Sequence, residues 1–484
     1  MAASEPHHVG GDHPPGSLRE LLAIAIPMII STGSLTLMQV VDRIFLTWDS
    51  PDCVAACLPA GMMHWLLMSP AFGTAMYVTT FVAQYMGAGE KSRVGSAVWQ
   101  GTIFSFVSGI VLVAGAQFAR QIFAVVGHDP HIATLEAQFF SIMCFGSIPT
   151  LLSCALSGYF AGQGRTRVVM FVNICGAVVN LVLDPVLIFG FAGIPALSIR
   201  GAAIATVMGE VAMTVLYIVL ILRDPSAREF GIWPERLFQP DLFLRLLRFG
   251  IPNGFHFLSD VCAFSVFIFL IGTMGKHALT ATNLAFNLNM LTFMPVLGMG
   301  MAVMTLVGNR IGEGRPDLAT KTTYLAFCVS AGWMLTFGIM YFTIPNLFLG
   351  IYQSEKSAVE FEEIRQLAMM LLKFIAVYGV FDAMAIIFSF AIRGAGDTRF
   401  ALCFSLVCGW TIMVLPTWLS LRSGSTSLVI PWLSCTGFIM VVGIGFFLRF
   451  LQGKWKRMRV IEVPAADGEN LSNAEEEPAV KLPV

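Results

Sequence analysis

Five acidic residues lie inside long apolar stretches of this 484-residue sequence: Asp42, Asp184, Glu210, Asp260 and Asp382. A charged Asp at the centre of a membrane-spanning helix costs about 2.5 to 3.5 kcal/mol on insertion scales, so such residues are usually retained for a function. A carboxylic acid held away from water can keep a proton near neutral pH, and an ionised one can bind a hard cation. The five acids are therefore candidates for binding protons or cations.

The best-defined polar set lies on one predicted helix in the first half of the chain. Asn173, Asn180 and Asp184 are spaced seven and four residues apart, so they share one helix face. Pro185 follows at once, and its ring blocks the helix hydrogen bond to the carbonyl of Leu181. A carboxylate, an amide oxygen and a free carbonyl suit a hard cation or a proton relay. The alternative is a proline-kinked helix in which Asp184 only caps the backbone.

The remaining charged residues of the apolar stretches are less clearly placed. Asp42 ends the first stretch directly before Arg43, so an exposed carboxylate at a helix end is the alternative to a functional one; we favour function. Glu210 has no evident polar partner, and Lys373 lies nine residues before Asp382. The sequence assigns no role to Glu210 or Lys373.

Two acids in the second half each have a polar neighbour one helical turn earlier. His256 precedes Asp260 by four residues, and Tyr378 precedes Asp382 by four. Two buried acids in one half are hard to explain by packing, so we expect a second ion site there. For His256 alone, a core imidazole with a satisfied hydrogen bond is at least as good an interpretation as a role in proton transfer.

The composition excludes most classes of soluble protein. Hydrophobic residues make up 56% of the chain and charged residues 12%, against about 25% charged in ordinary soluble domains. The formal net charge of -1 provides no basic surface for nucleic acid. The ten cysteines include no C-x-x-C pair, and enzyme signatures such as G-x-S-x-G and H-E-x-x-H are absent. We expect no enzyme, no cofactor, no obligate protein partner and no metal other than a possible sodium ion.

Twelve apolar stretches alternate with polar or Gly/Pro-containing breaks, and each could cross about 30 Å of hydrocarbon as a helix. They begin near Leu21, Val54, Ser96, Ile132, Val168, Gly201, Leu244, Leu279, Thr322, Gln366, Leu402 and Ser427. Because twelve is even, both termini share one side. Of the 29 Lys and Arg residues, 21 fall on that side, seven fall opposite and one, Lys373, lies within a span. This bias predicts a multi-pass protein of the cell inner (plasma) membrane with both termini in the cytoplasm.

The two halves of the sequence repeat each other. The pattern V-x-T-x-V-x-x-x-x-G-x-G starts at Val78 and again at Val303. The pattern S-x-x-x-x-G-x-G-x-T-R starts at Ser157 and again at Ser389. Each repeat holds six spans, so both halves cross the membrane in the same sense and are related by an axis along its normal. The predicted fold is an all-α membrane protein of twelve transmembrane helices in two six-helix lobes, an architecture typical of transporters.

The predicted domain organisation follows from these spans. A cytosolic N-terminal tail covers 1–20, the N-lobe 21–222, a cytosolic linker rich in Arg and Pro 223–243, and the C-lobe 244–451. The cytosolic C-terminal tail at 452–484 starts basic, becomes acidic and is expected to be disordered.

The sequence resembles the multidrug and toxic compound extrusion (MATE) family across nearly all of residues 21–451. The resemblance rests on Pro27 with Asp42 and on four motifs: A-G-Q-G-R-T-R at 161–167, N-L-V-L-D-P at 180–185, G-A-A-I-A-T at 201–206 and R-G-A-G-D-T-R at 393–399. It implies a fold of twelve helices within the lipid bilayer, arranged in two lobes that open in a V. It also implies that the protein exports organic cations in exchange for protons or sodium.

The resemblance also implies ion-coupling residues in both lobes. The N-lobe cation site of the DinF-like branch is matched by Asp42, Asn180, Asp184 and Thr206. In the second lobe, residues of the NorM-like branch are matched by Tyr378 and Asp382, and Asp260 stands where that branch usually carries Glu. The chain therefore combines features of both branches.

The function expected from these observations is a secondary-active antiporter that exports organic, cationic compounds in exchange for protons or sodium. A flippase for lipid-linked sugars can share this helical layout, but it should carry basic residues in its central cavity to meet a pyrophosphate. A receptor or channel is a third possibility, for which the repeat and the doubled acidic sites are poor evidence.

Overall fold

The computed structural model describes residues 13–126, 128–191, 193, 195–233, 236–350, 358–424 and 427–462. Within these ranges twelve helices are long and apolar enough to cross a membrane, which confirms the predicted number. Most of them begin a few residues before the predicted span. For example, α9 begins at Pro240 rather than at Leu244, because its polar first turn continues the helix beyond the apolar stretch.

The N-lobe contains the first six spans. The first is α1 (Leu18–Asp49), and the second consists of α2 (Pro51–Met76) and α3 (Val78–Gly87), which meet at a break at Tyr77. The third span is α4 (Val94–Gly115) with α5 (Ala119–Val126). The other three are α6 (Pro130–Gly162), α7 (Thr166–Phe189) and α8 (Ile199–Leu222). Pro185 lies inside α7, which continues past it for four residues.

The C-lobe repeats this arrangement. Its first spans are α9 (Pro240–Gly272), α10 (Lys276–Gly312) and α11 (Pro316–Thr343), which the short α12 (Pro345–Leu349) follows. The fourth span is α13 (Ala358–Ala395). The fifth is α14 (Thr398–Cys408), the π-helical segment η5 (Gly409–Val414) and α15 (Leu415–Arg422). The last span is α16 (Val429–Leu451).

The sequence repeat corresponds to a two-fold relation in space. A Cβ atom built on Gly87 would lie 1.9 Å from the carbonyl oxygen of Asn309, and one on Gly312 would lie 2.2 Å from that of Gln84. These are equivalent pairs, because Gly87 and Gly312 hold the same position of the repeated pattern, as do Gln84 and Asn309. Any larger residue would force the lobes apart at both points. The two-fold axis therefore runs between α3 and the end of α10.

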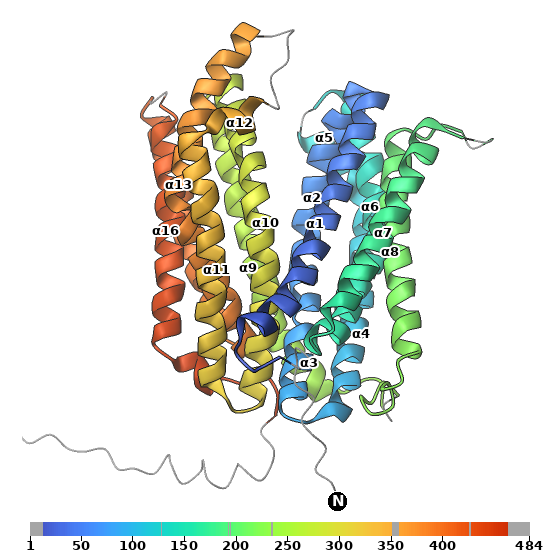
Figure 1. Cartoon of the computed structure of the whole chain (residues 1–484). Coiled ribbons are helices and arrows are strands. Elements are labelled where there is room, and N and C mark those ends of the chain that lie inside the picture. The colour runs from blue at the N-terminus through green and yellow to red at the C-terminus, as the bar shows by residue number, and fades with distance from the viewer. Residues whose placement is uncertain are drawn as a thin grey trace, which may run out of the picture.

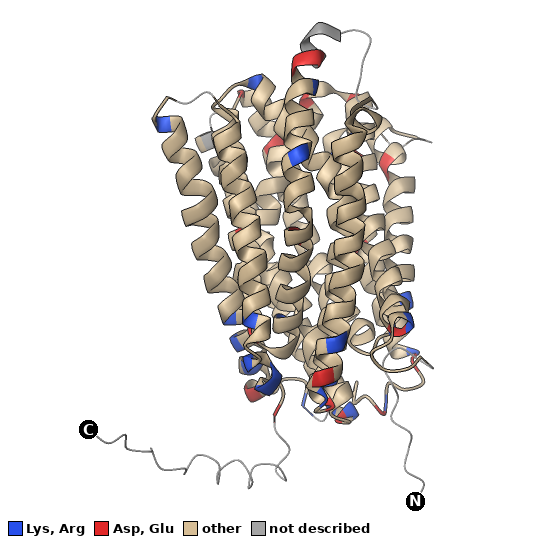
Figure 2. Ribbon diagram, turned by 60° about the vertical axis from the view of Figure 1, so that its left-hand side comes forward, with Lys and Arg blue, Asp and Glu red and all other residues tan. Residues whose placement is uncertain are grey.

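The lobes approach each other mainly at one end. Figure 1 shows α3 against α10 at the lower end of the molecule, while the two groups of helices diverge toward the upper end. Figure 2 shows that Lys and Arg residues gather mainly at the same lower end. We refer to this end, where α1 begins and α16 finishes, as the basic end.

Candidate functional site

The four predicted N-lobe residues come together from three helices. Asn180 and Asp184 on α7 are fully buried, and their side chains lie beside the carboxyl group of Asp42 on α1. Thr206 Oγ1 on α8 donates a hydrogen bond of 3.2 Å to Asp42 Oδ2. Because α7 packs against both α1 and α8, residues far apart in sequence form one polar cluster. We call Asp42, Asn180, Asp184 and Thr206 the N-lobe cluster.

The N-lobe cluster is short of hydrogen-bond donors. Within the described part of the chain, neither carboxylate oxygen of Asp184, nor Asp42 Oδ1, nor either amide atom of Asn180 has a hydrogen-bond partner. Two adjoining buried carboxylates repel each other if both are ionised, and the desolvation of each is costly. A proton shared by the pair, or a monovalent cation between them, relieves the repulsion and offsets one of the two negative charges. The geometry is therefore that of a site for one small positive charge.

The alternative of an exposed helix-end carboxylate does not fit Asp42. Its side chain is half-buried and turned toward α7 and α8, whereas the neighbouring Arg43 is exposed.

The third polar residue of the predicted α7 face, Asn173, lies nearer the basic end than the N-lobe cluster. Its Nδ2 donates to Ser31 Oγ on α1 at 2.6 Å, and its Oδ1 accepts from the Tyr217 hydroxyl at 3.1 Å.

The C-lobe acid Asp260 belongs to a mixed charged cluster. Its Oδ2 lies 3.5 Å from Nδ1 of His256, and Nε2 of the same ring is 3.0 Å from Ser405 Oγ on α14. The buried guanidinium of Arg393 on α13 also interacts with the Asp260 charge. Arg393 in turn donates from Nη1 to Asn253 Oδ1 at 3.0 Å. Asp260 thus faces a cation supplied by the protein itself.

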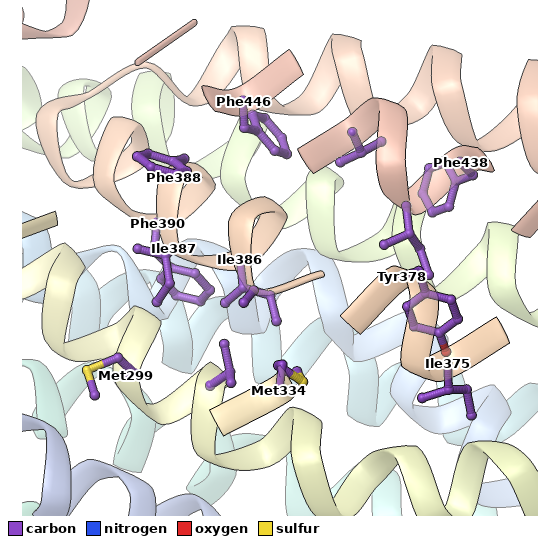
Figure 3. Packing of buried hydrophobic residues seen from close by; sticks show 14 of the residues in the cluster. Met299, Met334, Ile375, Tyr378, Ile386, Ile387, Phe388, Phe390, Phe438 and Phe446 are labelled. Atoms are coloured by element: carbon purple, nitrogen blue, oxygen red, sulfur yellow. The ribbon is translucent and has the colours of Figure 1, made fainter. Parts of the chain in front are cut away.

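Asp382 lies elsewhere in the C-lobe. Its charge interacts with the Tyr378 hydroxyl and the Cys435 thiol. Tyr378 is buried in the apolar core beside Ile375 (Figure 3), and its hydroxyl lacks a hydrogen-bond partner among the described residues. Asp382 precedes Arg393 by eleven residues, so it lies about 16 Å farther from the basic end along α13. The structure therefore does not join Asp260 and Asp382 into one site.

Several partners in these clusters were not predicted from the sequence. Arg393 stands in the R-G-A-G-D-T-R motif, but its charge interaction with Asp260 is between α13 and α9, two helices that are far apart in the sequence. No feature of the sequence indicated that Ser405 would lie beside His256. Lys373 is exposed, with Nζ 5.8 Å from the centre of the Phe342 ring, so it does not partner Asp382.

Hydrogen bonds between the lobes close the basic end. The Tyr77 hydroxyl donates to the carbonyl of Arg393 at 2.7 Å, and Asn253 Nδ2 donates to the carbonyl of Gly73 at 2.6 Å. Nearer the end, Gln84 Nε2 donates to the carbonyl of Gly394 at 3.0 Å. These bonds require helix backbones to approach closely, so they hold the basic end shut in this conformation.

The segment after α16 adds to this closure by crossing to the N-lobe. The Val460 N–H donates to Gln84 Oε1 at 2.8 Å, and the Tyr85 hydroxyl donates to Glu462 Oε2 at 2.7 Å. Val460 and Ile461 are buried in the apolar core of the N-lobe. The expectation of disorder was therefore wrong for residues 452–462, because the side chains of Val460 and Ile461 pack into the apolar core of the N-lobe. Residues 463–484 lie outside the described part of the chain.

The Glu462 contact depends on charge. Burial alone would raise the pKa of the Glu462 carboxyl, but the hydrogen bond from Tyr85 and the charges of Arg245 and Arg93 hold that pKa below its ordinary value. A carboxyl whose pKa is lowered on folding stabilises the fold above its unfolded-state pKa and loses this effect as the pH falls through the folded-state pKa. The contact therefore weakens in acid.

Comparison with known proteins accounts for the fold and the repeat. The family model for MatE matches residues 27–186 and 252–419, two segments that begin at equivalent positions of the two halves. The chain belongs to the MatE family. MatE relatives include the probable multidrug resistance proteins NorM of Thermotoga maritima, 24% identical over 92% of this chain and 94% of that protein, and of Bacillus thuringiensis, 26% identical over 82% and 86%.

Solved MATE structures share the fold. A multidrug resistance MATE transporter in an outward-facing conformation superposes with a TM-score of 0.83 at 19% identity, over 95% of this chain and all of that one. A eukaryotic MATE transporter superposes with a TM-score of 0.80 at 20% identity, over 90% and 96%. This MatE-family chain is therefore a multi-pass membrane transporter with the twelve-helix, two-lobe fold.

Proposed function

We propose that this protein is a secondary-active antiporter that exports organic, cationic compounds from the cytoplasm in exchange for protons or sodium ions. The observation that carries the proposal is the N-lobe cluster, in which the half-buried carboxyl group of Asp42 adjoins the fully buried one of Asp184. The names of the NorM relatives, probable multidrug resistance proteins, support export of drug-like compounds.

The pair of carboxyl groups can couple the two fluxes because it holds one positive charge at a time. When a proton or sodium ion enters from outside, it offsets one of the two negative charges of the pair and displaces the cationic compound, which had offset the same charge. When the ion leaves toward the cytoplasm, the pair again attracts a cation. One monovalent cation exported per ion is electroneutral, whereas a second ion would add about 2.3 kcal/mol per 100 mV of membrane potential.

The flippase alternative has less support. A lipid-linked pyrophosphate would need basic groups free to meet it, but the buried guanidinium of Arg393 is hydrogen-bonded to Asn253 and interacts with the charge of Asp260. The acids Asp42, Asp184 and Asp382 would instead repel a pyrophosphate. Transport of organic cations agrees better with this distribution of charge.

We test the proposal by measuring ethidium efflux from liposomes that contain the purified protein, under proton and sodium gradients imposed separately. One of the two gradients should drive efflux, and the double variant Asp260→Asn, Asp382→Asn should lose about tenfold in rate or change its ion dependence. Antiport would be refuted if the rate of efflux by the wild-type protein were the same with and without each gradient. An unchanged rate and ion dependence in the double variant would show that coupling resides in the N-lobe alone.

The proposed orientation places the basic end and both termini in the cytoplasm of a plasma-membrane protein, as the distribution of Lys and Arg supports (Figure 2). In a cysteine-free variant, a single cysteine at the exposed Ser423 should react with an impermeant maleimide added to whole cells, and one at the exposed Ser92 should not. Labelling of Ser92→Cys from outside would show that the protein lies in the membrane in the opposite orientation.

A further inference from the structure

Glu210 is a half-buried acid that the proposed exchange does not yet use. It lies on α8, one turn after Thr206, and its side chain faces α6. Ser153 Oγ donates to Glu210 Oε2 at 3.3 Å, and the hydroxyl of Thr150 also lies close enough to bond the carboxylate. The predicted lack of a partner was therefore wrong: the partners come from another helix, which the sequence around Glu210 does not reveal.

Helix packing does not require this carboxylate. Besides the Ser153–Glu210 bond, α8 is joined to α6 at this level by Thr214, whose hydroxyl donates to the carbonyl oxygen of Pro149 at 2.8 Å. Among the described residues Glu210 forms no ion pair; the titratable groups near it are the Cys154 thiol of α6 and the Tyr217 phenol of α8. A Gln would make the same hydrogen bonds without the cost of placing an acid in the membrane interior.

Glu210 instead stands in a column of polar groups that leads away from the N-lobe cluster. Thr206, Glu210, Thr214 and Tyr217 are spaced four, four and three residues apart, so they follow one face of α8. At its upper end Thr206 bonds Asp42, and at its lower end Tyr217 bonds Asn173.

The lower end of this column lies toward the basic end and is hydrogen-bonded to α7 through Asn173. From Asn173 it reaches Ser31 on α1. A Cβ atom built on Gly209 would lie 3.0 Å from the carbonyl oxygen of Gly176, so α7 and α8 are in close contact beside Glu210. Along α8, Glu210 lies about 6 Å nearer the basic end than Thr206.

We propose that Glu210 is a third cation-binding acid of the N-lobe, which receives the coupling ion from the Asp42–Asp184 pair on its way to the cytoplasm. The inference rests on the proposed antiport function. If the ion is a proton, the O–H bond of the protonated pair breaks and an O–H bond forms on the Glu210 carboxylate, and nothing else changes. If the ion is sodium, the Glu210 carboxylate and the hydroxyls of Ser153 and Thr150 are the oxygen ligands that meet it.

The experiment compares Glu210→Gln and Glu210→Asp with wild type in the ethidium efflux assay, under proton and sodium gradients in turn. Glu210→Gln should lower gradient-driven efflux about tenfold or more, because an amide cannot carry the ion. Ethidium binding to the purified protein without a gradient should stay within about twofold of wild type, because the Asp42–Asp184 pair is intact. Glu210→Asp should restore part of the efflux. The gradient that the Gln variant no longer uses identifies the ion.

The matched control is Glu229→Gln, which removes an exposed carboxylate paired with Lys91 and should leave efflux unchanged. Infrared difference spectra between acid and alkaline buffers give a readout that does not need transport. If the ion is a proton, Glu210→Gln should lose one carboxylic-acid C=O band that Asp184→Asn retains.

The outcomes separate this inference from the function on which it rests. Wild-type rate and ion dependence in Glu210→Gln, alongside inactive Asp184→Asn, would overturn the role of Glu210 and leave antiport standing. Wild-type efflux that follows neither gradient would overturn both. A proton-driven Glu210→Gln variant that keeps every carboxylic-acid band would also overturn the role.

Discussion

Replacing Asp184 with Asn is expected to abolish gradient-driven efflux while leaving membrane insertion and expression near wild type. Asn has almost the same shape as Asp, so the packing of α7 against α1 and α8 should persist. The amide cannot release a proton or offer a charged oxygen to a cation, so the N-lobe cluster loses the property that couples the two fluxes. The measurement is ethidium efflux from liposomes, where we expect a loss of about a hundredfold or more.

The same result is expected for Asp42→Asn, because the two carboxyl groups share one charge. Asp52→Asn on α2 is the matched control, since that carboxylate is exposed and only approaches His131. Near-wild-type efflux by both Asp42→Asn and Asp184→Asn would mean that the cluster is structural and that coupling resides elsewhere.

Replacing Glu20 with Gln is expected to weaken the closed basic end strongly. Arg310 on α10 is fully buried and pairs with Glu20 of α1 and with Glu313, whose oxygens lie 2.8 and 2.9 Å from Nη1. Removing one partner of a buried ion pair costs about 3 to 5 kcal/mol, because the remaining charge stays buried with less compensation. We therefore expect a clear fall in the thermal unfolding temperature of the purified protein.

A second readout separates opening of the lobes from general unfolding. Ala83 of α3 is fully buried against the C-lobe, so in a cysteine-free background Ala83→Cys should react slowly with maleimide in wild type and much faster with Glu20→Gln. The matched control is Glu362→Gln, which breaks an exposed pair with Arg365 and should leave the unfolding temperature and the labelling rate unchanged. Equal unfolding temperatures and labelling rates in Glu20→Gln and wild type would show that the pair does not hold the lobes together.

The membrane helices and the two lobes could be predicted because each depends on local or periodic features of the sequence. A span needs only about 20 apolar residues, and the repeat of 78–89 at 303–314 is readable without knowing any contact. The face shared by Asn180 and Asp184 likewise follows from helical spacing alone.

Contacts between helices could not be read from the sequence, because nothing local specifies which face of one helix meets another. The partner of Glu210 is Ser153 of α6, and the charge facing Asp260 is that of Arg393 on α13. The packing of Val460 and Ile461 into the N-lobe overturned an expectation based on composition.

The sequence by itself determined that this is a twelve-span membrane protein with a repeated half and acids in its interior, because the cost of polar groups in lipid dictates where each kind of residue can lie. Only the tertiary structure decided which acids stand together, since α7 brings Asp184 to Asp42 while α13 keeps Asp382 far from Asp260. Burial makes that difference decisive: two adjoining carboxyl groups need a mobile positive charge, whereas Asp260 already has Arg393.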